Sequence, residues 1–213
     1  MGNSANGWWV KLLKKEEIMK TTPKFLMFGC MTLALVFTSC SSDSEDEITK
    51  PLAIGDFHEG GVIFYMDGTG QHGLLCAVSD QSTAAEWCGS VAEINGADGT
   101  VIGTGSQNTI DIVAGCTTGG TAADLCINLT LKNYSDWFLP SKDELNEMYL
   151  NKASINATAT ANGGTAFAAD TYWCSTELDL GSNSSALTQN LGNGISGSLT
   201  KFGTAYVRAV RAF

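Results

Sequence analysis

An apolar run near the N-terminus, followed by a cysteine and an acidic stretch, limits how much of this chain can belong to a folded core. The run covers residues 25–37, about 13 residues, whereas a membrane-spanning helix needs roughly 20. Lys20 and Lys24 supply the positive flank of a signal peptide, and two small residues stand directly before Cys40. This order of features resembles the lipobox of a bacterial lipoprotein. We therefore expect Cys40 to be lipidated and to become the mature N-terminus.

The segment in front of this signal does not fit a signal peptide, because Met19 and Lys20 already provide the expected start. We expect translation to begin at Met19, so that residues 1–18 are an upstream extension and residues 19–39 are the signal peptide. The alternative is that the extension is made and lies on the membrane as an amphipathic segment.

The charge of the mature chain limits its partners. Removal of everything before Cys40 leaves about 7 basic and about 20 acidic residues, a net charge near −13. Such a surface repels polyanions, which excludes nucleic acid as a partner and disfavours heavily sulfated glycans. Residues 40–52 are rich in serine and acids, which predicts a solvated tether. Acids directly after a lipidated cysteine also resemble the surface-export signal of Bacteroidetes lipoproteins, so we expect an outer-membrane lipoprotein exposed at the cell surface.

Residues 53–213 are enough for one domain. Two apolar runs flank a glycine-rich turn, which predicts a β-hairpin over residues 61–67 and 73–78. Ser106 is predicted to cap a helix over residues 107–114, and Thr121 to cap one over residues 122–131, where apolar residues recur at helical spacing. Ser141 with Glu144 forms a capping box that begins a third helix.

The C-terminal part is predicted to be mostly strand. Residues 151–170 are rich in Asn, Ala and Gly and are predicted to form a loop. Strands are expected after it, at residues 171–176, 186–191, 197–202 and 205–213. The fold class is therefore α+β, with a mixed or antiparallel sheet and two or three helices.

The sequence offers no assembled catalytic set, so we expect no enzyme. Residues 68–73 fit a dinucleotide-binding pattern, but that pattern must open a helix and here a second strand follows. His58 and His72 are the only histidines, and neither has a second ligand at metal-binding spacing. We therefore predict no metal centre and no bound cofactor. Asp143 and Glu144 are explained by the first turn of a helix, where negative charge is favoured.

Five cysteines remain in the folded part: Cys76, Cys88, Cys116, Cys126 and Cys174. The expected compartment permits disulfides, although their connectivity cannot be deduced from the sequence. We prefer a Cys88–Cys116 pair, because both residues lie in loop-like segments that a cross-link would restrain. Cys76 and Cys126 lie on apolar faces, where buried free thiols are expected.

Three segments of the C-terminal half carry a specific resemblance. They are YSDWFLPSKDEL at residues 134–145, YWCSTE at 172–177 and YVRAVR at 206–211. In this order they resemble the signature blocks of a bacterial surface-domain family that includes the C-terminal domain of the Legionella collagen-like adhesin and the Fibrobacter paralogous domains. That family is similar in fold to C-type lectin-like domains and to the formylglycine-generating enzyme. The resemblance implies a C-type lectin-like domain over residues 53–213, whose long loops carry ligands.

Most residues of these blocks have a structural interpretation. Trp137 and Trp173 lie in apolar segments, which predicts core residues rather than sugar platforms. Arg208 and Arg211 are three apart, so they lie on opposite faces of a strand and cannot form a joint basic groove. Arginines in an apolar strand need carboxylate partners, and we expect these from the other two blocks, namely Glu144 and Glu177.

The preferred function is a surface-anchored recognition or adhesion module that binds glycan or another extracellular ligand. Lectin-like folds bind ligands through long loops and adjacent strands, where this chain offers Glu177, Asn183, Asn190 and Asn193. Their amides and carboxylate can bind sugar hydroxyls or a calcium ion, but Asn can equally serve turns. One alternative is an envelope component without a saturable ligand. Another is an oxidase of the formylglycine-generating type, for which Cys174 is the only hint because that chemistry uses a pair of thiols.

Overall fold

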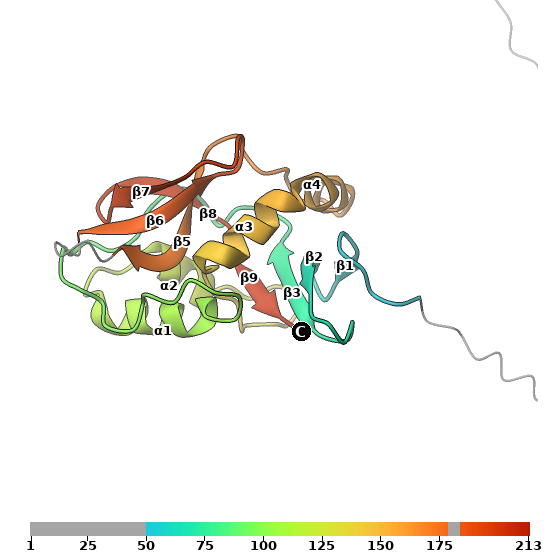
Figure 1. Cartoon of the computed structure of the whole chain (residues 1–213), viewed down its shortest axis with the longest axis horizontal. Helices are drawn as coiled ribbons and strands as arrows, with labels where there is room; N and C mark the ends of the chain where they lie inside the picture. Colours follow the sequence, from blue (N-terminus) through green and yellow to red (C-terminus); the bar gives the residue numbers. More distant parts are fainter. Residues whose placement is uncertain (1–49, 179–183) are drawn as a thin grey trace, which may run out of the picture. The chain divides into compact units, whose positions relative to one another are not determined.

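The computed structural model describes residues 50–178 and 184–213. The predictions for residues 1–49, including lipidation at Cys40, and for Asn183 lie outside the described residues. The described residues form two sheets and four helices, which confirms the α+β class, although only two or three helices were expected (Figure 1). Among these residues, no helix is both long enough and apolar enough to span a membrane.

A four-stranded antiparallel sheet contains the predicted hairpin. Its strands, in spatial order, are β1 (Phe57–His58), β2 (Gly61–Met66), β3 (Gly73–Ala77) and β9 (Val210–Ala212). In the β2–β3 turn, Asp67 Oδ1 accepts hydrogen bonds from the backbone N–H groups of Thr69 and Gly70, each at 3.0 Å. Gly70 adopts a φ of +70°, which glycine tolerates best. The glycine pattern at 68–73 therefore serves a turn, as expected.

A five-stranded sheet carries most of the C-terminal half. Its spatial order is β4 (Ser82–Glu86), β8 (Thr204–Val207), β5 (Thr171–Leu178), β6 (Ser185–Asn190) and β7 (Ser196–Thr200). All neighbours are antiparallel except β5 and β8, so the sheet is mixed. Strand β4 was not predicted. It forms one edge of this sheet, and β7 forms the other.

The C-terminal segment does not form the single strand predicted over residues 205–213. It leaves the five-stranded sheet after Val207 and enters the four-stranded sheet at Val210. Between the two strands, Ala209 N–H donates to the side-chain oxygen of Gln81 instead of to a neighbouring strand. Arg208, which lies between the two strands, is buried at this break.

The helices follow their capping signals closely where such signals exist. Helices α2 (Ala122–Ile127) and α3 (Lys142–Leu150) both begin with complete capping boxes, at Thr121 and Ser141. Helix α1 (Gly105–Gly115) begins before Ser106, at an N-cap without a side-chain hydrogen bond, so the cap predicted at Ser106 is wrong. Helix α2 ends four residues before its predicted end.

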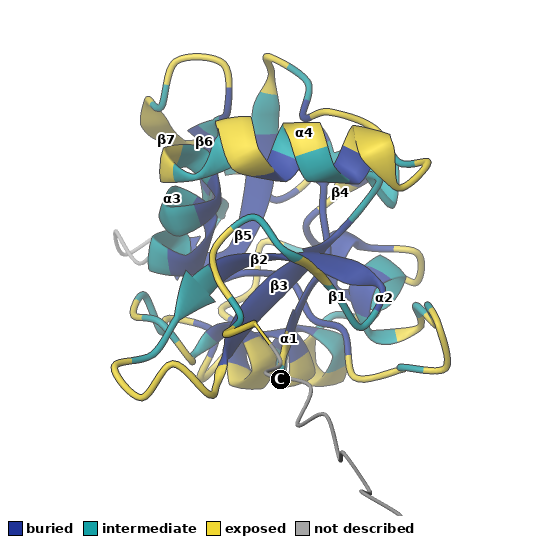
Figure 2. Ribbon diagram, turned by 90° about the vertical axis from the view of Figure 1, so that its right-hand side faces the viewer, coloured by how far each residue is buried: buried dark blue, intermediate teal, exposed yellow. Residues whose placement is uncertain are grey.

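Helix α4 (Lys152–Ala161) occupies part of the segment predicted to be a loop. Ile155 and Ala159 are one turn apart and fully buried, whereas the exposed positions are occupied by Ala, Ser and Thr. Figure 2 shows this helix with an exposed outer side over the buried strands. Two buried side chains at helical spacing therefore fix a helix that composition alone concealed.

Candidate ligand-binding surface

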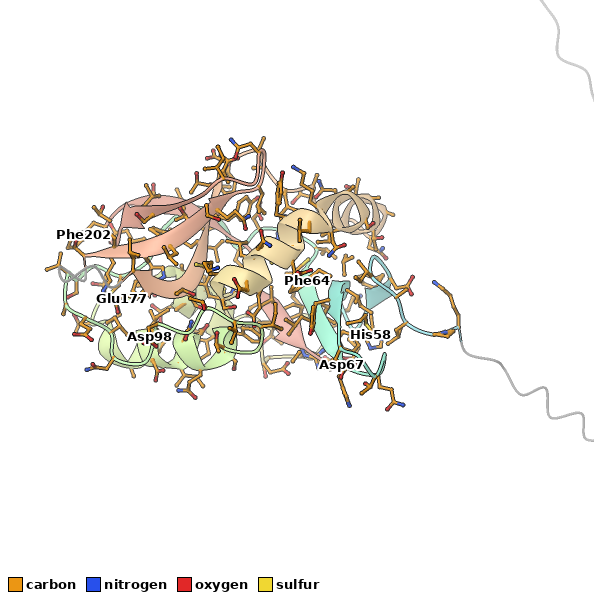
Figure 3. All side chains as sticks on the ribbon, in the orientation of Figure 1. His58, Phe64, Asp67, Asp98, Glu177 and Phe202 are labelled. Carbon is orange, nitrogen blue, oxygen red and sulfur yellow. A yellow bond between two sulfur atoms is a disulfide. The ribbon has the colours of Figure 1, made fainter. Side chains whose placement is uncertain are left out.

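The structure does not bring the predicted ligand residues together. Thr171 pairs with Asn190 at one end of the β5–β6 ladder, and Glu177 pairs with Ala186 near the other end. Six residues of strand span roughly 20 Å, too far for one sugar or ion to contact both. Figure 3 shows Glu177 on the side of the sheet that carries Phe202, away from the β2–β3 turn at Asp67. The prediction of one site containing Glu177 and Asn190 is wrong.

Glu177 has a structural role instead. It is 6% exposed, its Oε1 accepts a hydrogen bond from Lys201 Nζ, and its Oε2 accepts one from Ile94 N–H at 2.8 Å. Lys201 Nζ also donates to Ala92 O at 2.6 Å and lies 5.1 Å from the ring centroid of Trp87. This buried ion pair occupies the carboxylate, so it is not available to a ligand.

Asn190 and Asn193 shape the β6–β7 turn. The Asn190 side-chain oxygen accepts from the backbone N–H groups of Gly192 and Asn193, at 2.9 and 3.1 Å. The Asn193 side-chain oxygen accepts from Ile195 N–H at 2.9 Å. The sequence left open whether these residues bind a ligand or form a turn. In the structure their side-chain oxygens form the turn.

Both arginines are partly or fully buried, but their predicted partners are wrong. Arg208 donates to Asp80 at 2.7 Å and to Ala77 O at 3.0 Å. Arg211 binds Asp136 at 2.5 Å and Glu59 at 2.6 Å, and its hydrogen bond holds the pKa of Glu59 below the usual range.

Glu144 is unavailable to either arginine because it accepts hydrogen bonds from the backbone N–H groups of Ser141 and Gly103, each at 2.7 Å. Burial raises the pKa of this carboxyl, against the effect of those bonds. Glu177 is likewise occupied by Lys201. Trp137 and Trp173 are buried, as expected of core residues.

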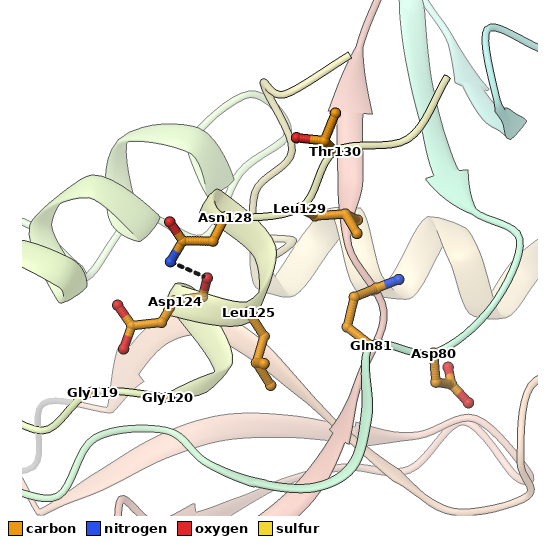
Figure 4. Close-up of a pocket in the computed structure, with 9 residues that line it drawn as sticks. All are labelled: Asp80, Gln81, Gly119, Gly120, Asp124, Leu125, Asn128, Leu129 and Thr130. Atoms are coloured by element: carbon orange, nitrogen blue, oxygen red, sulfur yellow. Dashed lines mark hydrogen bonds between the residues drawn. The ribbon is translucent and has the colours of Figure 1, made fainter. Parts of the chain in front are cut away.

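A hollow on the described surface lies between α2 and the chain that leads into β4 (Figure 4). It has a volume of about 660 Å³, and we call it the β4–α2 trough. The residues that line it are Asp80, Gln81, Gly119, Gly120, Asp124, Leu125, Asn128, Leu129 and Thr130.

The trough combines an apolar strip with a polar rim. Leu125 and Leu129 are four residues apart and half-buried, so they lie along one side of α2 and its C-terminal turn. Asp124 accepts from Thr121 N–H and Oγ1–H at 3.0 and 2.9 Å, and Asn128 donates to the backbone oxygen of Asp124 at 2.9 Å. These contacts orient the polar rim above the leucines.

The opposite wall is equally fixed. Asp80 is held by Arg208 and also accepts from the Tyr172 hydroxyl at 3.1 Å. Burial, together with the charge of Asp80, raises the pKa of Tyr172, so this hydroxyl stays protonated and remains a donor. The carboxylate next to the trough is therefore already neutralised by the domain itself.

A second, smaller hollow of about 320 Å³ continues along the β4 edge and shares Gly119 and Gly120 with the trough. The segment that carries these glycines is tied to the end of β4 by a disulfide between Cys88 and Cys116, whose Cα atoms are 5.8 Å apart. This is the pair preferred from the sequence. The cross-link fixes one wall of the trough against the sheet edge.

The surface with the trough lies within a region that matches a known protein family. A family model described as the Lcl C-terminal domain matches residues 76–211, which include all three signature blocks and every residue that lines the trough. The chain belongs to this family. No curated protein matches the chain significantly. Membership makes this an adhesin-associated domain of the cell surface, and the resemblance stated from the sequence is confirmed.

Two glycines leave the trough of this Lcl C-terminal domain open. A Cβ atom added at Gly119 or Gly120 would meet no atom within 4 Å. Gly120 has a φ of +80°, which strains any side chain, whereas Gly119 has no such restriction. A Cβ atom can therefore be added at Gly119, in the lining of the trough, without a clash inside the domain.

The free thiols of this Lcl C-terminal domain are poor nucleophiles. Cys76, Cys126 and Cys174 are buried and unpaired by disulfides. Burial raises the pKa of Cys76 to about 12 and that of Cys174 to about 11, so both remain thiols at neutral pH. Within residues 50–178 and 184–213, no group of three His, Cys, Asp or Glu side chains is arranged to hold a metal.

Proposed function

We propose that this domain is a lipid-anchored recognition module at the cell surface, which binds an uncharged glycan in the β4–α2 trough. The observation that carries the proposal is the trough itself, in a domain of an adhesin-associated family. Its volume of about 660 Å³ lies within the range of roughly 300–1,000 Å³ that is usual for ligand pockets. An apolar strip beside amide, hydroxyl and carboxylate groups suits a sugar, which has both an apolar face and hydroxyls.

The charges at the trough favour an uncharged ligand. The arginine nearest to it, Arg208, is 1% exposed and already paired with Asp80. The other acid of the lining, Asp124, accepts hydrogen bonds from Thr121 at the start of α2, and no lysine or arginine of the described residues forms an ion pair with it. A sulfate or uronate group would therefore meet negative charge without a counter-ion, so we expect heparin to bind weakly.

Calcium is not needed for this mode of binding. Asp80 and Asp124 both accept hydrogen bonds from the domain, which orients them without a metal. We therefore expect chelation with EDTA to leave glycan binding unchanged. Loss of binding with EDTA, restored by calcium, would favour a calcium-bridged sugar instead.

The test is a glycan array probed with the full-length protein, followed by titration of any glycan that binds. Gly119→Leu fills the trough, and we expect it to weaken binding at least tenfold without lowering the melting temperature. Gly68→Leu is the matched control, because a Cβ at Gly68 also meets no atom within 4 Å. Gly68 lies in the turn between β2 and β3, which belong to the other sheet. Equal binding by wild type and Gly119→Leu would place the ligand elsewhere. If no glycan binds saturably, the alternative of a structural envelope component is favoured.

A further inference from the structure

Strand β7 is an open edge of the five-stranded sheet. It pairs with β6 over five consecutive residue pairs without a register shift, and no other strand of the described chain pairs with it. All its residues are exposed except the half-buried Leu199. In Figure 1 the strand lies at the outer limit of the sheet. An edge of this kind presents unpaired backbone groups.

The hydrogen bonds at the two ends of the ladder show which groups point outward. Asn190 N–H donates to Ile195 O, and Lys201 N–H donates to Ser184 O, each at 2.9 Å. Bonding alternates along an antiparallel strand, so residues 195, 197, 199 and 201 face β6. Ser196, Ser198 and Thr200 therefore direct their N–H and C=O groups away from the sheet, and Ser198 lies at the centre of this set.

The edge lacks the usual protection against pairing. Residues 184–200 contain no charged side chain and no proline, although the chain carries a formal net charge of −10. Two negatively charged copies repel each other least where each presents an uncharged strip. The remaining polar groups are serine and threonine hydroxyls, which do not oppose strand pairing.

Two exposed apolar residues flank the strand. Ile195 is 66% exposed and Phe202 is 48% exposed, one at each end of β7. Because β7 runs from Ser196 to Thr200, an antiparallel pair centred on Ser198 brings the Ile195 end of one copy to the Phe202 end of the other. The pairing would therefore bring apolar side chains together at both ends.

We propose that β7 pairs antiparallel with β7 of a second copy, about a two-fold axis that passes between the two Ser198 residues. Each Ser198 exchanges both backbone hydrogen bonds with its counterpart, and Ser196 of each copy does so with Thr200 of the other. A symmetric contact of this kind uses the same surface on both copies, so it closes as a dimer. The five-stranded sheets of the two copies then form one continuous sheet.

Cysteine cross-linking of the full-length protein tests the register. Opposed residues of a hydrogen-bonded antiparallel pair have Cα atoms about 5.5 Å apart, within the range of disulfides. We expect Ser198→Cys to give a dimer that reduction abolishes. Ser196→Cys is the control, because two copies of this residue are separated by four residue steps, roughly 13 Å, and cannot cross-link. Equal dimer yields from the two variants would overturn the proposal.

Charge exchange tests the symmetry. Ser198→Lys and Ser198→Glu each place like charges on the axis, so in sedimentation experiments we expect each variant to dimerise at least tenfold more weakly than wild type. A mixture of the two should form heterodimers. Ala153→Lys, on the exposed side of α4, adds the same charge elsewhere and should dimerise as wild type. A monomeric wild type, or a Ser198→Lys variant that dimerises normally, would overturn the proposal.

Discussion

The two edges of the five-stranded sheet are built differently. The register of β4 shifts between Ser82 and Ala85, and the strand ends on the charged Glu86. The β7 ladder is regular and uncharged. Bulges and charges are the means by which sheets prevent edge-to-edge contact, so the β4 edge is protected and the β7 edge is not. The protected edge borders the trough, while the unprotected edge suits pairing with another strand.

One residue joins the ends of both edges. Lys201 follows β7, and its backbone oxygen accepts from the N–H groups of Trp87 and Cys88, at 3.1 and 3.2 Å, directly after β4. Its Nζ donates to Ala92 O and to Glu177. The buried Lys201 therefore contacts both the segment that carries the Cys88–Cys116 disulfide and the end of β7.

The largest expected effect is the loss of this lysine. Lys201→Met leaves the Glu177 carboxylate buried without its cation, which typically costs about 3–5 kcal/mol of unfolding free energy. Urea denaturation measures it. Lys50→Met is the control, because Lys50 also pairs with a carboxylate, that of Asp56, but its side chain is 74% exposed. If both variants unfold at the same urea concentration, the buried Lys201–Glu177 pair does not stabilise the contact between the two edges.

The second prediction tests whether the two edges of the five-stranded sheet are independent of each other. The Cys88–Cys116 disulfide closes a loop with a sequence separation of 28, so in the chain-entropy account Cys88→Ser should destabilise the domain by about 3–4 kcal/mol. The cross-link holds only the β4 side, so we expect glycan binding to weaken while Ser198→Cys cross-linking persists in the double variant. Loss of both properties at a temperature where the domain is still folded would contradict independent edges.

Features formed by residues close together in the chain could be predicted from the sequence, whereas ion pairs between distant residues could not. The Ser141–Glu144 capping box and the Asp67 turn depend on residues a few positions apart, and both were predicted correctly. The Arg208–Asp80 pair joins residues 128 positions apart, and the Lys201–Glu177 pair joins elements on either side of the β6–β7 hairpin. Nothing in the sequence distinguishes Asp80 from the other acids, so the partners of the arginines could not be predicted.

Two elements were missed for physical reasons. In β4 the sequence STAAE has neither branched aliphatic nor aromatic residues, so only its pairing with β8 makes it a strand. The trough was missed with it, because its walls come from residues 80–81 and 119–130 and meet only in the folded domain. The Cys88–Cys116 preference succeeded because loop-like flanks were visible in the sequence.

A smaller effect concerns the turn that leads into β7. Asn190→Ala removes the acceptor for two backbone N–H groups, and we expect a loss of about 0.5–1.5 kcal/mol of unfolding free energy per hydrogen bond. Since Asn190 lies in a turn of the opposite edge, glycan binding in the trough should not change. A variant that keeps its stability but loses glycan binding would restore Asn190 as a ligand residue and move the site to the β7 side.

The smallest expected effect tests how much room β7 has. A Cβ at Gly197 would meet only Thr188 Oγ1, at 3.6 Å, so Gly197→Ala should stabilise the domain by about 0.5–1 kcal/mol through the lower entropy of the unfolded chain. Gly61→Ala in β2 is the contrasting variant, because its Cβ would lie 2.5 Å from Leu75 Cδ1 and 2.6 Å from Cys76 O. We expect thermal unfolding to shift upward for the first and downward for the second. A lower melting temperature for Gly197→Ala would mean that β7 is more tightly enclosed than an open edge allows, and would weaken the contrast between the two edges.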